Sequence, residues 1–319
     1  MTQKSQPIDN NRLKDIRILY LLDYLNISGS KTHVLCIAEN FRKRGMHVVI
    51  AGKKGAYGKI FENYGFPVRY INFYGDGEDV RKKLKKVIKE ENIQIMHAHQ
   101  LVSARYASEV SKINNIPLVT TFHGTYYNDK KMVSISQKSD AIISCSYAVE
   151  EYLKNKLNIY SSVLIPNGIN LEEFYYVPSS SKLRKKFSIP NGVPIVLYPS
   201  RQDGRKYKIG LEIMDACHQY RKKHGTELHC IFAGTGKGKN KIIEAANKYN
   251  HLNGTPFIHV IGTYYDMPSL HSLSTIVVGT GRSGMEAMCC ERPLIAAGIQ
   301  GFRARRPDDG NEGGHRQCR

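Results

Sequence analysis

The sequence predicts an α/β protein with two domains, each built on a parallel sheet. The chain has 319 residues, about twice the usual size of one domain. Short apolar runs alternate with longer amphipathic segments, which is the order of strands and helices in a parallel sheet with right-handed crossovers. The second half of the chain repeats the order of the first. The sequence therefore predicts two doubly wound, Rossmann-like domains. We expect them to face each other across a ligand-binding cleft.

In the first half, strands are expected at six apolar runs. These are residues 16–22, 47–51, 68–73, 93–96, 117–122 and 141–144. A helix is expected over residues 32–44, because apolar side chains recur on one face and Gly45 follows where a helix ends. A second helix, over residues 78–91, begins with acids and continues with lysines.

In the second half, the same pattern predicts four strands and three helices. The strands are residues 194–198, 228–233, 257–261 and 275–278, and the helices are residues 210–223, 241–249 and 283–290. A polar stretch places the hinge near residues 165–190. We predict a disordered segment (1–14), an acceptor-side domain (15–175), an incomplete nucleotide-sugar-binding domain (176–301) and a tail (302–319).

The tail differs in composition from the rest of the chain. Over residues 302–319 the only aliphatic side chain is Ala304, and there are five Arg and no Lys. A frameshift product and an ordinary disordered basic terminus both fit this composition. In either case no packed element is predicted there.

The charge composition suits anionic partners, and from composition alone it indicates lysine-rich solvated faces more strongly. Forty-seven Lys and Arg against 28 Asp and Glu give a net charge of +19. The aromatic residues do not alternate with a basic stripe, so no nucleic-acid partner is expected. There is no apolar run of 18 residues and no apolar signal core, and the seven cysteines form no C-x-x-C pair. We therefore expect a cytoplasmic protein with reduced thiols.

Two loops of the first domain carry polar side chains where strands end. Gly29 opens a helix whose free N–H groups suit an anion, although a tight turn also needs glycine. His123 follows a strand, where its imidazole donates to a sugar hydroxyl or a carbonyl, or is satisfied by nearby backbone. His97 and His99 also end a strand. Because no third ligand cluster accompanies them, we predict loop packing and no metal site.

The second domain has a cluster of cations after its first strand. Residues 200–208 hold four cations within eight positions, including Arg201 and Lys206. Such a cluster suits a diphosphate, and it also suits a solvated turn in a lysine-rich chain. Residues 233–240 are rich in glycine but fit neither the phosphate-loop nor the dinucleotide-binding pattern, so we predict a flexible turn.

The most specific segment, residues 278–297, combines a strand, a glycine-rich turn and a helix that begins near Ser283. The turn amides and the start of the helix suit a phosphate. Glu286 lies one turn into that helix. Its carboxylate is placed to accept hydrogen bonds from a ribose diol, or merely to cap a loop or favour the helix dipole.

Taken together, these segments resemble the retaining glycosyltransferases of the GT-B fold, in the large family 4. The resemblance covers residues 16 to about 301. In the first half it rests on ILYLLDYLNISGSKTHV, IMHAHQ, PLVTTFHGTYY and SVLIPNGINLEEF. In the second half it rests on YPSRQDGRK, LHCIFAGTG and VVGTGRSGMEAMCCERPLIAAG. The resemblance implies transfer of a sugar from a nucleotide-diphosphate donor with retention of configuration, without a metal ion or other cofactor.

The resemblance also assigns roles to residues. Arg201 and Lys206 match the pair that neutralises the donor diphosphate, and His123 matches the histidine that contacts the donor sugar. These three are the expected catalytic residues. Glu286 matches the second glutamate of the family's E-x7-E motif, which holds the ribose. The expected donor-binding residues are Gly29, Arg201, Lys206, Gly279, Gly281, Arg282, Ser283 and Glu286.

The chain departs from the family pattern in three places. The first loop reads Ser28-Gly29 where the family often has paired glycines. The first glutamate of E-x7-E would fall at position 278, where the chain has Val278. Family members also usually continue beyond this length, so the second domain is expected to be incomplete. Two other interpretations stay open: a nucleotide-sugar epimerase on the same fold, and an inactive, truncated remnant that binds nucleotide sugar.

The acceptor suggested by the resemblance is a lipid-linked compound or a glycan, in cell-envelope glycan biosynthesis. The basic helix around residues 80–89 is one candidate for peripheral contact with the inner face of an anionic membrane. Its apolar residues recur at core spacing, however, which favours packing against the sheet with a solvated outer face. These apolar residues are Val80, Leu84, Val87 and Ile88.

Overall fold

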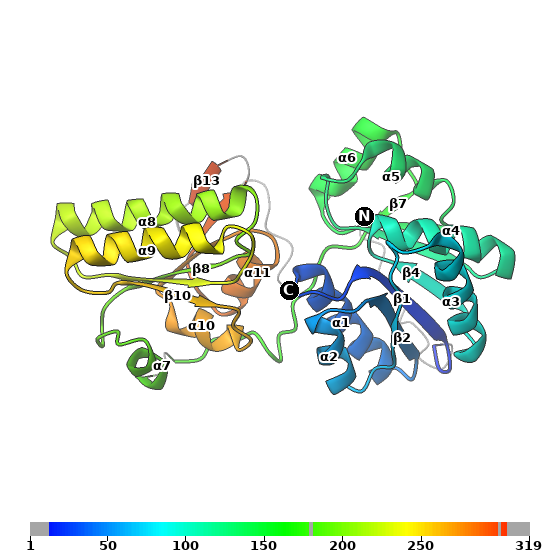
Figure 1. The fold of residues 1–319 in the computed structure, drawn as a ribbon, viewed down its shortest axis with the longest axis horizontal. Helices are drawn as coiled ribbons and strands as arrows, with labels where there is room; N and C mark the ends of the chain where they lie inside the picture. Colours follow the sequence, from blue (N-terminus) through cyan, green and yellow to red (C-terminus); the bar gives the residue numbers. More distant parts are fainter. Residues whose placement is uncertain (1–12, 179–180, 299–300, 305–319) are drawn as a thin grey trace, which may run out of the picture. The chain divides into compact units, whose positions relative to one another are not determined.

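The computed structural model describes residues 13–178 and 181–298 and the backbone of 301–304. The chain divides into two compact units, Met1–Gly168 and Ile169–Arg319. Each unit is an α/β domain built on one sheet (Figure 1). The predicted fold class, two Rossmann-like domains with parallel sheets, is confirmed.

The first unit has seven parallel strands in the order β3-β2-β1-β4-β5-β6-β7. The strands are β1 (Arg17–Tyr24), β2 (His47–Lys53), β3 (Val68–Tyr70), β4 (Ile95–Ala98), β5 (Leu118–Phe122), β6 (Ala141–Ser144) and β7 (Ser162–Leu164). The helices are α1 (Gly29–Lys43), α2 (Ala56–Asn63), α3 (Gly77–Glu90), α4 (Leu101–Asn114), α5 (Asp129–Ser136) and α6 (Tyr147–Leu157).

Alternation along β1 explains why helices cover both faces of this sheet. Leu19 and Leu21 point to the face covered by α3 to α6, whereas Tyr20 and Leu22 point to the face covered by α1 and α2. All four side chains are fully buried. A strand buried on both faces has to be apolar at every position, so its sequence reads as a continuous apolar run.

The second unit has six strands in the order β10-β9-β8-β11-β12-β13. The strands are β8 (Ile195–Pro199), β9 (His229–Ala233), β10 (Ile258–Gly262), β11 (Ile276–Gly279), β12 (Leu294–Gly298) and β13 (Gly301–Ala304). The helices are α7 (Ser181–Lys186), α8 (Arg205–His224), α9 (Lys239–Asn253), α10 (Met267–Leu273) and α11 (Arg282–Cys289). One core joins the sheet to α8 and α9, and a second joins it to α10 and α11 (Figure 1).

Two predictions about the second unit need correction. Residues 301–304 form β13, which pairs antiparallel with β12, although no packed element was predicted after residue 301. An edge strand is held by backbone hydrogen bonds, so an apolar sequence is not required. The rest of the predicted tail lies outside the described residues. Helix α8 begins at Arg205 instead of residue 210, because Gly204 supplies the sharp backbone turn that starts it.

Helix α3 packs as its apolar spacing predicts. Val80, Leu84, Val87 and Ile88 are buried in the core of the first unit. Asp76 caps the helix by accepting hydrogen bonds from two backbone N–H groups, and the lysines occupy the outer face. Among the described helices, none combines the length and apolar character needed to cross a bilayer.

Both sheets reverse their strand order at one point. In the first unit the reversal lies between β1 and β4, and in the second it lies between β8 and β11. Ligands of doubly wound sheets bind outside the carboxyl ends of the strands at this point, because the two following loops diverge and leave a crevice. Ligand-binding residues are therefore expected in the loops after β1, β4, β8 and β11.

Candidate active site

The loops after β8 and β11 lie side by side in the second unit. Val277 on β11 is paired with Leu197 on β8, so the two strands end at the same edge. Each loop leads into a helix that begins at a glycine with positive φ: Gly204 before α8 and Gly281 before α11. Neither helix start has a side-chain cap, so backbone N–H groups there are available to an anion.

Arg201 and Lys206 provide the positive charge at this edge. Arg201 lies in the loop after β8, and Lys206 is the second residue of α8; both are exposed. Loss of hydration around its ammonium group, and then the neighbouring Arg201, lower the pKa of Lys206. Arg205 differs, because it forms an ion pair with Glu212 at 3.4 Å. Two repelling cations without an acidic partner among the described ion pairs suit a diphosphate.

The glycine-rich loop after β9 supports the loop that carries these cations. Gly238 donates a backbone hydrogen bond to the carbonyl oxygen of Gln202 at 2.7 Å, and Lys237 donates one to the Asp203 carboxylate at 2.7 Å. At Gly234 a Cβ atom would lie 2.1 Å from the carbonyl oxygen of Ser200, so only glycine permits this approach. The predicted turn is present, and it is hydrogen-bonded to the loop that carries Arg201.

Glu286 is held in place inside α11. Its side chain is buried, and its Oε1 accepts a hydrogen bond from Arg282 Nε at 2.8 Å. Its Oε2 lies 3.7 Å from Nε2 of His271, a fully buried histidine that the sequence analysis did not single out. A carboxylate has four lone-pair directions, so Glu286 keeps acceptor capacity for a hydroxyl pair.

Position 278 has a structural explanation. Val278 lies inside β11, where it is 3% exposed and belongs to the core packed by α8 and α9. The loop between β11 and α11 holds only Thr280 and Gly281. A glutamate eight residues before Glu286 would therefore lie in the core, away from the ligand edge. The missing glutamate at position 278 therefore reflects the core position of this residue in β11.

The remaining predicted residues of this loop shape its backbone. Gly279 ends β11, and a Cβ atom there would lie 3.0 Å from Ser283 Oγ. Ser283 Oγ donates to the carbonyl oxygen of Thr280 at 3.1 Å, which closes the turn at the start of α11. These contacts set the direction of the N–H groups that the helix presents.

In the first unit, Gly29 is the first residue of α1, directly after β1 and its turn. Two residues on, Lys31 is 3% exposed. Its Nζ donates to Gln100 Oε1 at 2.9 Å, and Gln100 also accepts a hydrogen bond from the backbone N–H of Asp23. Sequence reasoning missed Lys31 as a buried cation, since a lysine in a polar turn normally points into solvent.

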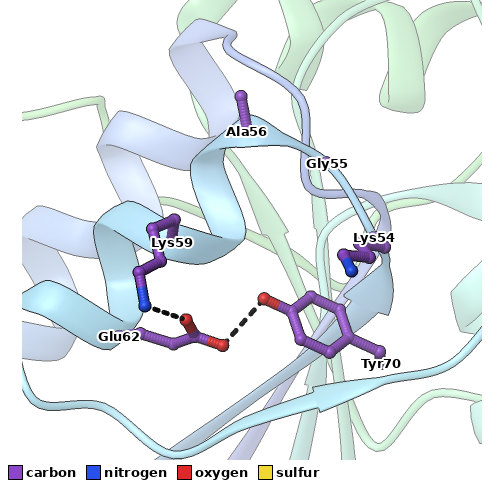
Figure 2. Close-up of a pocket in the computed structure, with 6 residues that line it drawn as sticks. All are labelled: Lys54, Gly55, Ala56, Lys59, Glu62 and Tyr70. Carbon is purple, nitrogen blue, oxygen red and sulfur yellow. Dashed lines mark hydrogen bonds and ion pairs between the residues drawn. The ribbon is translucent and has the colours of Figure 1, made fainter.

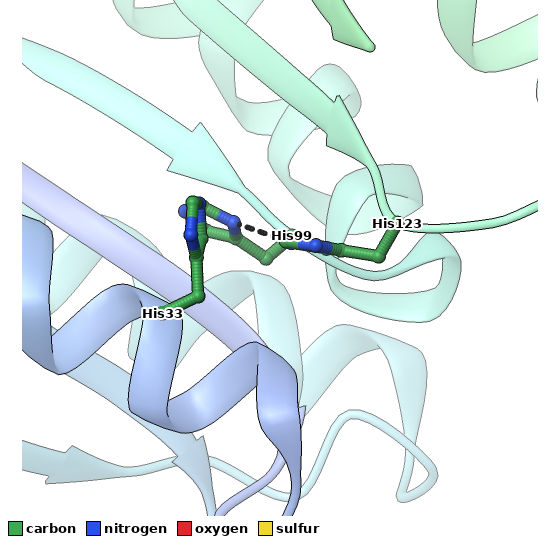
Figure 3. A group of neighbouring side chains, drawn as sticks. All are labelled: His33, His99 and His123. Carbon is green, nitrogen blue, oxygen red and sulfur yellow. Dashed lines mark hydrogen bonds between the residues drawn. The ribbon is translucent and has the colours of Figure 1, made fainter. Parts of the chain in front are cut away.

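The histidines gather at the switch point of the first unit. His123, after β5, shares a 2.9 Å hydrogen bond with His99, after β4. The ring of His33, from α1, lies 5.2 Å from that of His123, measured between centroids (Figure 3). His97 stacks on His99 at 4.2 Å and shares a 2.8 Å hydrogen bond with Thr121. The premise that no third ligand cluster accompanies His97 and His99 is therefore wrong.

A separate cavity of about 550 Å³ lies beside α2 (Figure 2). Its polar groups are bonded to one another, since Glu62 accepts a hydrogen bond from Tyr70 at 2.8 Å and pairs with Lys59 at 3.3 Å. We therefore place the candidate active site at the switch points and not in this cavity. It is lined by Lys54, Gly55, Ala56, Lys59, Glu62 and Tyr70.

Comparison with known proteins matches both halves of the chain. Residues 27–173 match Glycosyltransferase Family 4, and residues 179–305 match Glycosyl transferases group 1. The protein EpsD of Bacillus subtilis is 24% identical over 289 residues, which are 82% of this chain and 74% of EpsD. A phosphatidyl-myo-inositol mannosyltransferase of Propionibacterium freudenreichii is 22% identical over 260 residues, 78% of this chain and 63% of that protein.

Among solved structures, HepE of Anabaena in complex with UDP-glucose superposes with a TM-score of 0.73 at 20% identity. The match covers 88% of this chain and 79% of HepE. The two Rossmann-like sheets and this superposition show that the chain has the GT-B fold. Together the two matched family models span most of the chain, and both describe glycosyltransferases.

Proposed function

We propose that this protein transfers a sugar from a nucleotide-diphosphate donor to an acceptor hydroxyl, with retention of the anomeric configuration. The observation that carries the proposal is the pairing of Arg201 and Lys206 with two uncapped helix starts at the switch point of the second unit. This edge combines cations and backbone N–H groups, which together suit the two phosphates of a donor.

The chemistry of transfer explains why such an edge is needed. As the bond from the sugar to the diphosphate breaks, positive charge grows on the sugar and negative charge on the leaving phosphate. Arg201 offers a planar fork of donors, and Lys206 offers a compact charge. The N–H groups at the start of α11 add fixed dipoles that do not have to reorganise during the reaction.

Two further residues take roles in the proposal. Glu286 holds the ribose diol through the acceptor capacity that Arg282 leaves free. His123 donates a hydrogen bond to the donor sugar. Burial lowers the pKa of His123 to about 3, so its imidazole is neutral at neutral pH and donates from one nitrogen only.

HepE supports the choice of a first donor to test, because its structure was solved with UDP-glucose. We propose a UDP-sugar as the donor class. A panel of glycan and lipid-linked hydroxyl compounds is the starting point for identifying the acceptor.

Product analysis tests the proposed reaction. The purified full chain is incubated with UDP-glucose and the acceptor panel, and the products are examined by mass spectrometry and proton NMR. A new α-linked glucoside would support transfer with retention, because the glucose of UDP-glucose is itself α-linked. A β-linked product would overturn retention. Conversion of the donor sugar without an acceptor would favour the epimerase, and binding without turnover would favour the inactive remnant.

A further inference from the structure

We propose that His33, His99 and His123 form a binding site for one Zn²⁺ ion. The three residues come from α1 and from the loops that follow β4 and β5, so the fold brings together ligands far apart in sequence (Figure 3). One ring nitrogen from each residue lies within 4.8 Å of the other two. Three histidines are a ligand set that zinc uses where a fourth position stays open.

The geometry needs only small side-chain movements to accept the ion. Zinc–nitrogen bonds of about 2.0–2.1 Å in a tetrahedral site separate the ligand nitrogens by about 3.4 Å. The nitrogens of the group would draw together by about 1.4 Å at most.

An unpartnered atom provides an independent reason to expect a ligand. His99 is fully buried, and its Nε2 has no hydrogen-bond partner. A buried ring nitrogen without a partner is costly, and a metal ion or a ligand donor would satisfy it. His97 stacks on His99 and is itself bonded to Thr121, which holds the plane of the His99 ring.

The protonation state of the cluster favours metal binding. Burial, followed by the charges of the neighbouring histidines, holds the pKa of His99 well below its usual range. Burial likewise lowers the pKa of His123 to about 3. Neutral imidazoles carry the lone pairs that zinc needs, so little proton release opposes binding at neutral pH.

One charge opposes the ion and limits its affinity. The buried Lys31 ammonium acts on His99 and His123, and it is held by Gln100 and Ser30. The carboxylate of Asp23 partly offsets this charge from the same switch point, where it accepts hydrogen bonds from the first N–H groups of α4. Three zinc–nitrogen bonds stabilise the complex by more than the screened repulsion from Lys31 destabilises it. We therefore expect specific but reversible binding.

Zinc at this site would also affect catalysis. This consequence rests on the proposed function, in which His123 donates to the donor sugar. If zinc binds the same ring nitrogen that would face the donor sugar, that nitrogen cannot make the hydrogen bond, and Zn²⁺ would inhibit transfer by competing with the donor. The metal site itself does not depend on the reaction, and its test uses no sugar donor.

The chain offers a matched control in its second unit. His229 and His259 share a 2.9 Å hydrogen bond and stack at 5.2 Å, as His99 and His123 do, but no third histidine belongs to this pair in the described structure. Burial, and then His229, lower the pKa of His259 to about 4. Glu227 lies 3.4 Å from Nε2 of His229, whereas His259 is bonded to Nδ1 on the other side of that ring. The three residues therefore do not converge on one point, and this pair should not retain zinc.

The experiment measures metal binding by untagged protein. The full chain and the variants His99→Gln, His123→Gln and His259→Gln are equilibrated with Zn²⁺, dialysed and assayed for metal by mass spectrometry. Co²⁺ titration then reports coordination through its visible absorption. We expect about one Zn²⁺ per chain and a tetrahedral Co²⁺ spectrum for the wild type and His259→Gln. Binding should be at least about 10-fold weaker in His99→Gln and His123→Gln.

Two outcomes would overturn the proposal. The first is a wild-type chain that retains no Zn²⁺ after dialysis. The second is metal binding by both His99→Gln and His123→Gln that equals the wild type. His99 is buried and its variant needs a folding check by circular dichroism, whereas His123 is partly exposed and its variant should fold. Zinc binding without any transferase activity would leave the site standing and count against the proposed function alone.

Discussion

Gly204 and Gly281 begin the helices that follow the neighbouring strands β8 and β11, and the two glycines have nearly the same backbone conformation. Gly204 has φ 51° and ψ −130°, and Gly281 has φ 60° and ψ −131°. Nothing lies within 4 Å of a Cβ atom built at either position. Glycine is required at both sites by the backbone and not by crowding, since other residues rarely adopt this combination of φ and ψ. In the second unit, a glycine in this conformation thus begins two helices whose N–H groups lie at the same edge of the sheet.

Replacing Gly281 should therefore damage the site more than the fold. We expect Gly281→Ala to lower the free energy of unfolding by about 1–3 kcal/mol and to reduce turnover strongly, because the start of α11 has to reorient. Gly254→Ala is the control, since Gly254 has φ 73° but ends α9. Urea unfolding and rate measurements on both variants test this. Equal turnover in the two would contradict it.

The cation pair should be essential for turnover and dispensable for folding. We expect Arg201→Ala and Lys206→Ala each to lower the rate about 100-fold, the usual effect of removing one charge-assisted donor to a transition state. Both side chains are exposed, so thermal melting should be unchanged. Arg205→Ala removes a cation already paired with Glu212, and its rate should stay near normal. Near-normal rates in all three variants would show that Arg201 and Lys206 do not bind the donor diphosphate.

Restoring the family glutamate at position 278 should fail. The side chain of Val278 is buried in β11, so Val278→Glu should lower the free energy of unfolding by about 3 kcal/mol or more without raising activity. Burial raises the folded-state pKa of such a carboxyl. The loss should therefore be larger at pH 8 than at pH 5. Val278→Ala controls for lost packing, and a Glu variant as stable as this control would show that position 278 reaches solvent.

The histidine cluster should make the protein sensitive to acid. Burial lowers the pKa of His97 and His123 to about 3 and that of His99 well below 6.5. Below about pH 6.5 the unfolded chain binds protons that the folded chain does not, so stability is full above this pH and falls toward pH 3. Each histidine contributes about 1.4 kcal/mol per pH unit in this window.

Urea unfolding between pH 7.5 and 5.5, without added metal, measures this dependence. Over this range His97→Gln should lose about 1.4 kcal/mol less stability than the wild type, because the unfolded His97 goes from mostly neutral to mostly protonated. An identical slope in the two proteins would mean that His97 is protonated in the folded state.

The sequence by itself determined the fold class and most of the strands. Buried parallel strands such as β1 and β8 are apolar at nearly every position, so short apolar runs mark them directly. Helices such as α4 were missed, because their buried faces use small and polar residues that break the apolar period. The phosphate-suited loops were found because glycines and cations follow strands at fixed points.

Tertiary structure alone decided how distant residues meet. The buried position of Lys31, the close packing of Gly234 on the loop of Arg201, and the core location of Val278 depend on how strands pair in register. The histidine cluster likewise depends on the order β1-β4-β5, which places the ends of β4 and β5 beside α1. A local pattern records how one segment folds, whereas a site is set by contacts between segments separated in sequence, and these arise only when the sheet forms.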